Sequence, residues 1–228
     1  IPYGPLSMDP AAKVLHYGQE IFEGLKAYRS GDGRVLLFRP EDNFRRLAEG
    51  AERLSMPPLP VETGIEALTA LLKLDRDWVP EAPATLYIRP FMFGDEPALG
   101  VSASRNVTFC IITSPSGAYY ESGWGPVRIY VEDKYVRAVR GGFGYAKTGG
   151  NYAVSLYPGE EAHRKGYDQV LWLDGVEQRH VEEVGAMNIF FLFDDELVTP
   201  APQGSILSGI TRKSVLQMAE RMGLRTVE

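Results

Sequence analysis

The stretch Gly141-Gly142-Phe143-Gly144-Tyr145-Ala146-Lys147-Thr148-Gly149-Gly150 holds five glycines and one lysine in ten residues. Ordering so many glycines costs conformational entropy, so such a loop is typical of places where the backbone passes close to another group. Lys147 is either a solvated loop cation, the usual state of a lysine, or an amine held for chemistry. The residues of the loop leave both interpretations open.

The same stretch comes close to the phosphate-binding loop G-x-x-x-x-G-K-[ST] of nucleotide-binding proteins. Lys147-Thr148 fit that motif, but Ala146 stands where the motif has glycine. In addition, Gly149-Gly150 follow where a helix should begin and present its N-terminus to phosphate. Both departures argue against nucleotide binding.

Two further stretches could contribute to a site. Glu182-Glu183 lie between apolar β segments, and they form either an exposed strand edge or a source of one carboxylate buried beside a cation. Ser208-Gly209-Ile210-Thr211-Arg212 run into a predicted helix, whose first N–H groups are a natural seat for an anion. An ordinary N-cap by Ser208 or Thr211 explains that second stretch equally well.

The composition narrows the class of protein. The 228 residues are 44% hydrophobic with a net charge of -6, which allows one large core or two modest ones and gives no general attraction for nucleic acid or anionic lipid. Cys110 is the only cysteine, which excludes an intrachain disulfide; we expect a buried, inert thiol and a cytoplasmic protein. No apolar run approaches the ~20 residues that span a bilayer, and the start at Ile1 has no signal-peptide pattern.

The periodicity predicts a mixed α+β chain in two domains. A segment rich in Gly, Pro and Ser at 114–126 is the best linker candidate, so we expect a small N-terminal domain at 1–118, a linker at 119–126 and a larger domain at 127–228. Helices are predicted at 40–55, at 63–74 with a capping box from Thr63 to Glu66, from about 150 to 164 with a kink or break near Pro158-Gly159, and at 211–222. Strands are predicted at 34–38, 85–93, 106–113, 127–132, 169–173, around His180, at 188–193 and at 196–198, with a turn at Asp194-Asp195.

Six motifs in this order resemble the branched-chain aminotransferases, enzymes of fold type IV that depend on pyridoxal 5'-phosphate (PLP). They are HYGQEIFEGLKAY (16–28), LYIRP (86–90), SGAY (116–119), KTGGNY (147–152), EVGAMN (183–188) and SGITR (208–212). Each motif is weak alone, but the ordered set is specific and covers essentially the whole chain. The resemblance favours the functional interpretation of each candidate stretch.

The resemblance assigns the cofactor residues. Lys147 matches the lysine that forms the Schiff base with PLP and then moves the substrate proton. Glu183 matches the acid that pairs with the pyridine nitrogen, whereas Glu182 points to the other face of a strand and is expected to be structural. Other matches are Tyr152 for the phenolic oxygen and, for the phosphate, Arg46 with the backbone N–H groups of Ile210 and Thr211. From its helix pattern alone, Arg46 would be a solvated arginine.

The resemblance also implies a substrate. The reaction would be the reversible transfer of the amino group of L-leucine, L-isoleucine or L-valine to 2-oxoglutarate, with no metal. The substrate end would be built by Tyr17, Phe22, Tyr87, Arg89 and Tyr119, with Val101 on a loop that reaches the partner's active site in a homodimer. Aromatic walls suit a branched side chain, and Arg89 suits the side-chain carboxylate of glutamate.

Two alternatives stay open. Other fold type IV enzymes, such as D-amino acid aminotransferases and aminodeoxychorismate lyases, share the lysine and the glutamate. Members of the family also start before Ile1 and continue past Glu228 with the rest of the PLP-binding domain, so we expect the chain to be truncated at both ends. A catalytically incompetent fragment is therefore the second alternative.

Overall fold

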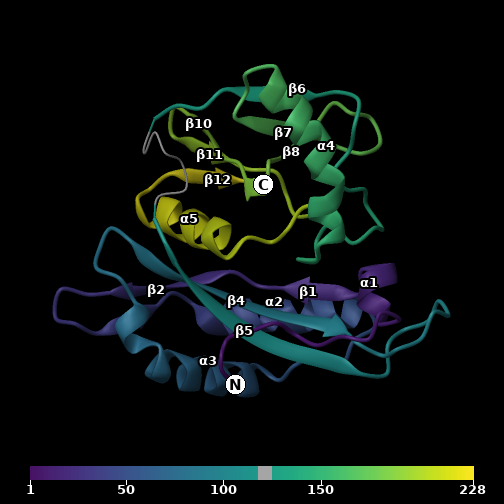
Figure 1. Ribbon diagram of the computed structural model, residues 1–228. Helices are drawn as coiled ribbons and strands as arrows, with labels where there is room; N and C mark the ends of the chain where they lie inside the picture. The colour runs from purple at the N-terminus through teal and green to yellow at the C-terminus, as the bar shows by residue number, and fades with distance from the viewer. Residues whose placement is uncertain (118–124) are drawn as a thin grey trace. The chain divides into compact units, whose positions relative to one another are not determined.

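The computed structural model describes residues 1–117 and 125–228. The chain divides into two compact units, Ile1–Ala118 and Tyr119–Glu228 (Figure 1). Each unit contains helices and sheet, so the predicted α+β class is confirmed. Within the described ranges, no helix is long and apolar enough to cross a membrane.

The first unit is built on an antiparallel sheet around the long strand β4 (Thr85–Gly94). One edge of β4 pairs with β5 (Val107–Ser116), and the other edge pairs first with β1 (Glu20–Phe22) and then with β2 (Leu25–Arg29). A short strand, β3 (Val35–Leu37), pairs with β2. Because β1 and β2 share one edge of β4, residues 23 and 24 lie at the break between them.

Two helices pack with this sheet (Figure 1). Helix α2 (Pro40–Arg53) buries the predicted apolar stripe, including Phe44, Leu47 and Ala51. Helix α3 runs over Val61–Leu74 and lies so close to α2 that a Cβ at Gly64 would fall 2.3 Å from the Phe44 ring. The capping box predicted from Thr63 is wrong, because α3 begins two residues earlier, after Pro60, and has no side-chain cap. The unit also contains α1 (Lys13–Tyr17) and the 3-10 turn η1 (Arg76–Trp78).

The second unit contains a four-stranded sheet in the order β6 (Ile129–Glu132), β7 (Gln169–Leu173), β8 (Val181–Val184) and β9 (Met187–Asn188). Strands β6 and β7 are parallel, and helix α4 (Gly150–Arg164) lies on the connection between them. Trp172 and Val170 of β7 pack against Ala162 of α4 in a small apolar core. Of the kink or break predicted near Pro158-Gly159, the break is wrong, because Pro158 is buried inside a continuous α4.

A three-stranded sheet completes the second unit. It consists of β10 (Phe191–Phe193), β11 (Glu196–Val198) and β12 (Arg225–Val227), with α5 (Ile210–Arg221) connecting the parallel pair β11 and β12. The single strand predicted at 188–193 is wrong, because β9 and β10 belong to different sheets and the chain passes between them at 189–190. The predicted turn at Asp194-Asp195 joins β10 and β11, with Asp194 at a positive φ of 49°.

Two other expectations are revised. Strand β5 continues to Ser116, beyond the predicted end of the strand at 113 and into the segment rich in Gly, Pro and Ser at 114–126. Cys110 on β5 is half-buried rather than fully buried, and burial raises the pKa of its thiol, in keeping with an unreactive group.

Candidate active site

The glycine-rich loop before α4 passes close to another segment of the second unit. A Cβ at Gly144 would lie 2.3 Å from the carbonyl oxygen of Ser205 and 2.5 Å from Ala138 Cβ. The loop is tied to the first turn of α4 by Asn151, whose side-chain amide donates to Phe143 O at 2.9 Å and Ala146 O at 2.7 Å. Close approach of the backbone therefore explains the glycine at 144.

This loop holds Lys147 against α4. The Nζ of Lys147 donates to the hydroxyl of Tyr152 at 2.5 Å and lies 5.0 Å from the centre of its ring. Lys147 is half-buried. It is therefore not a freely solvated loop cation, and Tyr152, one of the predicted cofactor residues, is its direct neighbour. The start of α4 at Gly150 also removes one argument against a nucleotide loop, since a helix does begin after Lys147; the substitution of Ala146 remains.

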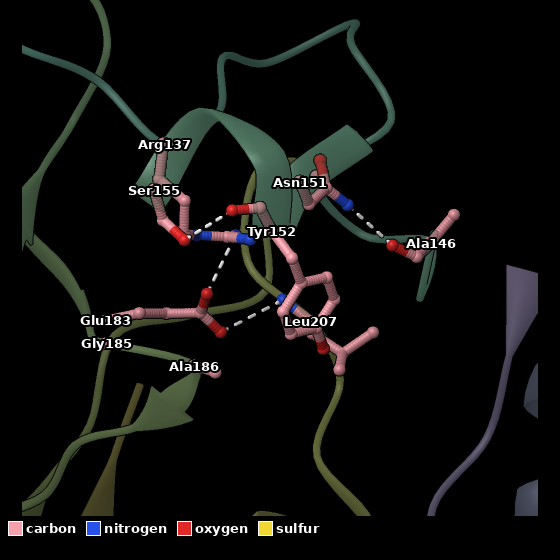
Figure 2. A pocket seen from close by; sticks show the side chains of 10 residues that line it. Arg137, Ala146, Asn151, Tyr152, Ser155, Glu183, Gly185, Ala186 and Leu207 are labelled. Atoms are coloured by element: carbon pink, nitrogen blue, oxygen red, sulfur yellow. Dashed lines mark hydrogen bonds and ion pairs between the residues drawn. The ribbon is translucent and has the colours of Figure 1, made fainter. Parts of the chain in front are cut away.

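Glu183 lies in β8 and is buried, with 3% of its surface exposed. One carboxylate oxygen, Oε1, accepts from Asn188 Nδ2 at 3.1 Å and from the Leu207 N–H at 3.3 Å. The other, Oε2, is 2.7 Å from a guanidinium nitrogen of Arg137 (Figure 2). Burial raises the pKa of Glu183, while the charge of Arg137 lowers it. An exposed strand edge, one of the two interpretations of this segment, is wrong.

Arg137 is the partner that the sequence did not reveal. Its guanidinium also donates to the carbonyl oxygen of Ser205 at 2.5 Å, and its Nε is buried with no hydrogen-bond partner in the described part of the chain. Arg137 lies in an irregular stretch among other charged residues, so no periodicity marks it as buried. Only the tertiary structure shows that Arg137 is the cation that balances the buried Glu183.

Glu182, the neighbour of Glu183, is buried too. Its Oε1 accepts a hydrogen bond from the hydroxyl of Ser205, and its Oε2 has no partner among the described residues. Burial raises the pKa of Glu182. The two adjacent carboxylates thus have different partners, as expected for neighbouring residues of a strand.

The start of α5 lies beside Glu183. Helix α5 begins at Ile210 after Gly209, and no side chain caps it, so the alternative of an N-cap by Ser208 or Thr211 is wrong. A Cβ at Gly209 would lie 2.0 Å from Asn188 Oδ1, and the amide of Asn188 donates to Leu207 O at 2.9 Å as well as to Glu183. This packing fixes the first turn of α5, where N–H groups lack partners within the helix.

These elements enclose a pocket within the second unit (Figure 2). Its free space is about 340 Å³, including the part open to solvent. Its lining combines glycine backbone, a carboxylate, a guanidinium and hydroxyl groups, from Arg137, Gly144, Ala146, Asn151, Tyr152, Ser155, Glu183, Gly185, Ala186 and Leu207. Such a lining suits a small polar molecule more than an apolar ligand.

The first unit brings together three of the residues predicted for the substrate. The guanidinium of Arg89 lies 4.4 Å from the ring centre of Phe22 and 5.3 Å from that of Tyr87, and it donates to the Tyr87 hydroxyl at 2.9 Å. Gly24 makes room for this hydroxyl, since a Cβ there would lie 2.3 Å from it. Arg89 and Tyr87 alternate along β4 and therefore share one face of the sheet.

The other predicted residues of the first unit have different surroundings. The hydroxyl of Tyr17 donates to the carbonyl oxygen of Leu99, which ties α1 to the loop that carries Val101, and the Val101 side chain is 86% exposed. Arg46 on α2 is not the solvated arginine that its helix pattern suggested. Its side chain is 14% exposed and forms an ion pair with Glu23, which is fully buried. Tyr119 lies outside the described residues.

Comparisons with known proteins show which sequences and structures resemble this chain. The family model of amino-transferase class IV matches residues 20–228. The chain is 59% identical to "Branched-chain-amino-acid transaminase 1" of Bacillus subtilis over 98% of its own length and 63% of that protein. It is 55% identical to a "Probable branched-chain-amino-acid aminotransferase" of Staphylococcus aureus over 100% of its own length and 64% of that protein. The chain therefore spans somewhat less than two thirds of these curated relatives.

Solved structures resemble the chain both in fold and in sequence. A branched-chain amino acid aminotransferase of T.th. with pyridoxamine 5'-phosphate matches with a TM-score of 0.86 and 29% identity, over 100% of this chain and 73% of that one. The branched-chain aminotransferase of Thermoproteus uzoniensis with norvaline matches with a TM-score of 0.85 and 28% identity, over 96% and 71%. The predicted fold type IV is thereby confirmed. The chain belongs to the amino-transferase class IV family.

Proposed function

We propose that the protein containing this chain is a PLP-dependent branched-chain amino acid transaminase, which reversibly transfers the amino group of L-leucine, L-isoleucine or L-valine to 2-oxoglutarate. The observation that carries the proposal is that the Lys147 amine contacts the Tyr152 hydroxyl, while Tyr152 and Glu183 line one pocket. The names of the relatives from Bacillus subtilis and Staphylococcus aureus support the substrate class.

The residues in and beside the pocket fit PLP. Lys147 offers an amine for the aldehyde, Tyr152 a hydroxyl for the phenolic oxygen, and Glu183 a carboxylate for the ring nitrogen. The uncapped first turn of α5 offers the N–H groups of Ile210 and Thr211 to the phosphate. When bound, PLP supplies an aldehyde that condenses with amines and a ring that withdraws electrons from the substrate α-carbon.

Lys147 has two proposed tasks. Its Nζ would hold the cofactor and, once released, would carry the proton between the substrate α-carbon and the C4′ atom of the cofactor. The Tyr152 hydroxyl, 2.5 Å away, holds this amine beside a residue that lines the pocket. Proton transfer by a positioned group is typically worth ~10²–10⁴ in rate, so the loss of Lys147 should exceed that range because attachment of the cofactor is lost too.

Glu183 would keep a proton on the ring nitrogen of the cofactor. The task requires an ionised carboxylate, yet burial alone favours the neutral acid and raises its pKa. The guanidinium of Arg137 at 2.7 Å opposes that effect. We infer that Arg137 preserves the negative charge of Glu183, which makes Arg137 the positioning residue missing from the sequence-based site.

The substrate end is proposed in the first unit. Phe22 and Tyr87 provide aromatic surface for a branched side chain, whose burial stabilises binding by ~1.5–3 kcal/mol. Arg89 between them provides a guanidinium for the side-chain carboxylate of glutamate or 2-oxoglutarate. Tyr17, Tyr119 and Val101 are proposed to complete the substrate site, and Arg46 the phosphate site.

The organisation of the whole protein is also a proposal. We propose a small domain at 1–118, a linker at 119–126, and a PLP-binding domain that begins at 127. The protein would act as a cytoplasmic homodimer on small amino acids and 2-oxo acids, without nucleic acid or membrane partners.

A substrate panel on the natural protein that contains this chain tests the proposal. With 2-oxoglutarate as acceptor, L-leucine, L-isoleucine and L-valine should each react faster than D-alanine. Faster turnover of D-alanine than of all three branched substrates would indicate a D-amino acid aminotransferase instead. Lack of the visible absorption band of bound PLP would indicate a chain that cannot hold the cofactor.

A further inference from the structure

The first unit buries a carboxylate that has no task in the proposed function. Glu23 follows β1, and its side chain is 0% exposed. Its Oε2 accepts hydrogen bonds from Asn43 Nδ2 at 2.8 Å and from the Gly24 N–H at 3.1 Å. A fully buried charge is tolerated only when it is paired and hydrogen-bonded. The cation that pairs with it is Arg46.

The pair with Arg46 has two points of contact. The Nε of Arg46 lies 2.7 Å from Oε1 of Glu23, and one terminal nitrogen, NH2, lies 2.9 Å from Oε2. Because a guanidinium is planar and rigid, two contacts fix both its position and its plane. Both contacts use the edge of the guanidinium that contains Nε.

Contacts with the sheet hold Glu23 in place, and Glu23 in turn holds Arg46. Phe22 of β1 pairs with Phe91, and Leu25 of β2 pairs with Ile88, so Glu23 and Gly24 bridge two strands on one edge of β4. The backbone N–H of Glu23 donates to Pro90 O at 2.7 Å. On α2, Asn43 precedes Arg46 by three residues and lies on the same side of the helix. These contacts restrain the Glu23 carboxylate from the sheet and from α2.

We propose that Glu23 is a positioning residue for the cofactor phosphate, because its two contacts fix the position and plane of the guanidinium of Arg46, the proposed phosphate ligand. The inference rests on the proposed role of Arg46. The competing interpretation is that the pair only pins α2 to the sheet. The two differ in what they predict for ligands with and without a phosphate, since a pinning role affects both kinds alike.

The test compares PLP with pyridoxal, which lacks the phosphate, in equilibrium binding to the purified apoprotein of the natural protein. Arg46→Ala should weaken PLP and leave pyridoxal nearly unchanged. Glu23→Gln should do the same and weaken PLP by about tenfold or more, the loss expected when one charge-assisted hydrogen bond is misplaced. Glu41→Gln, an exposed acid on the same helix, is the control and should change neither affinity.

Each outcome decides a separate point. Selective loss of PLP affinity in both Arg46→Ala and Glu23→Gln supports the proposal. Selective loss in Arg46→Ala alone, or equal loss of PLP and pyridoxal in Glu23→Gln, overturns the positioning role. No selective loss in Arg46→Ala refutes the assignment of Arg46 and with it this inference. If Glu23→Gln does not fold, Glu23→Asp keeps the charge but shortens the reach by one methylene, and it should show the same selective loss.

Discussion

Replacing Glu183 with glutamine would preserve the shape of a buried side chain and remove its charge. Its Oε2 lies 2.7 Å from Arg137, and both side chains are less than a tenth exposed. Removing one partner of a buried ion pair typically costs about 3–5 kcal/mol, because the other charge is left uncompensated. A glutamine still satisfies part of the hydrogen bonding, so we expect the free energy of unfolding to fall by about 3 kcal/mol.

The same change should slow catalysis without expelling the cofactor. A charge-assisted hydrogen bond is worth about 1.5–3 kcal/mol, which corresponds to roughly 10- to 150-fold in the rate of a single half-reaction. Urea unfolding of the apoprotein measures the stability, and stopped-flow decay of the visible PLP band with L-leucine measures the rate.

Glu182→Gln is the matched control, because Glu182 is adjacent and also buried. Its Oε2 has no hydrogen-bond partner within the described ranges, and burial already raises the pKa of this carboxyl. A neutral amide there should change the free energy of unfolding by less than about 1 kcal/mol. A Glu182→Gln variant that is as slow and as unstable as Glu183→Gln would refute the assignment of the charged partner to Glu183.

Three further predictions concern other parts of the chain. Arg89→Ala should lower kcat/KM for 2-oxoglutarate more than for L-leucine, and equal losses would mean that Arg89 is only structural. The backbone N–H and guanidinium of Arg105, with Lys13, lower the pKa of Glu96 from 4.5 to about 2. The stability that Glu96 contributes is therefore present above pH 4.5 and lost as the pH falls toward 2. Glu96→Gln should reduce the fall of the urea midpoint between these pH values. An unchanged fall would contradict the pairing. Gly144→Ala should cost about 1–3 kcal/mol in urea unfolding through overpacking, whereas Gly159→Ala, with open space around it, should not destabilise; equal effects would contradict the close approach at Gly144.

The sequence predicted elements whose pattern is local. The apolar stripe of α2 depends on spacing within one helix, and Phe44, Leu47 and Ala51 are buried as expected. Strands β7 and β11 have the predicted bounds, because short runs of β-branched and large apolar residues end at turn-forming residues on both sides. The glycines around Lys147 indicated a loop whose backbone passes close to another group, and Gly144 shows this close approach.

The remainder depended on partners that are distant in the chain. Strands β1 and β2 are too short to show a recognisable sequence pattern. They are stabilised by pairing with β4, which lies far along the chain. Arginine and glutamate side chains are usually exposed. Arg137 and Glu183 are buried because each balances the charge of the other. Arg46 is buried through Glu23 in the same way. Pairing of this kind leaves no periodic signal in a sequence.

Reduction of the holoenzyme with borohydride, followed by peptide mapping, tests most directly whether Lys147 carries the cofactor. Reduction makes the bond between PLP and its lysine permanent, so the modified peptide identifies the residue. The phosphopyridoxyl label should appear on Lys147, whose amine lies 2.5 Å from the Tyr152 hydroxyl. A label on Lys134 or Lys26 instead would contradict the assignment of the site.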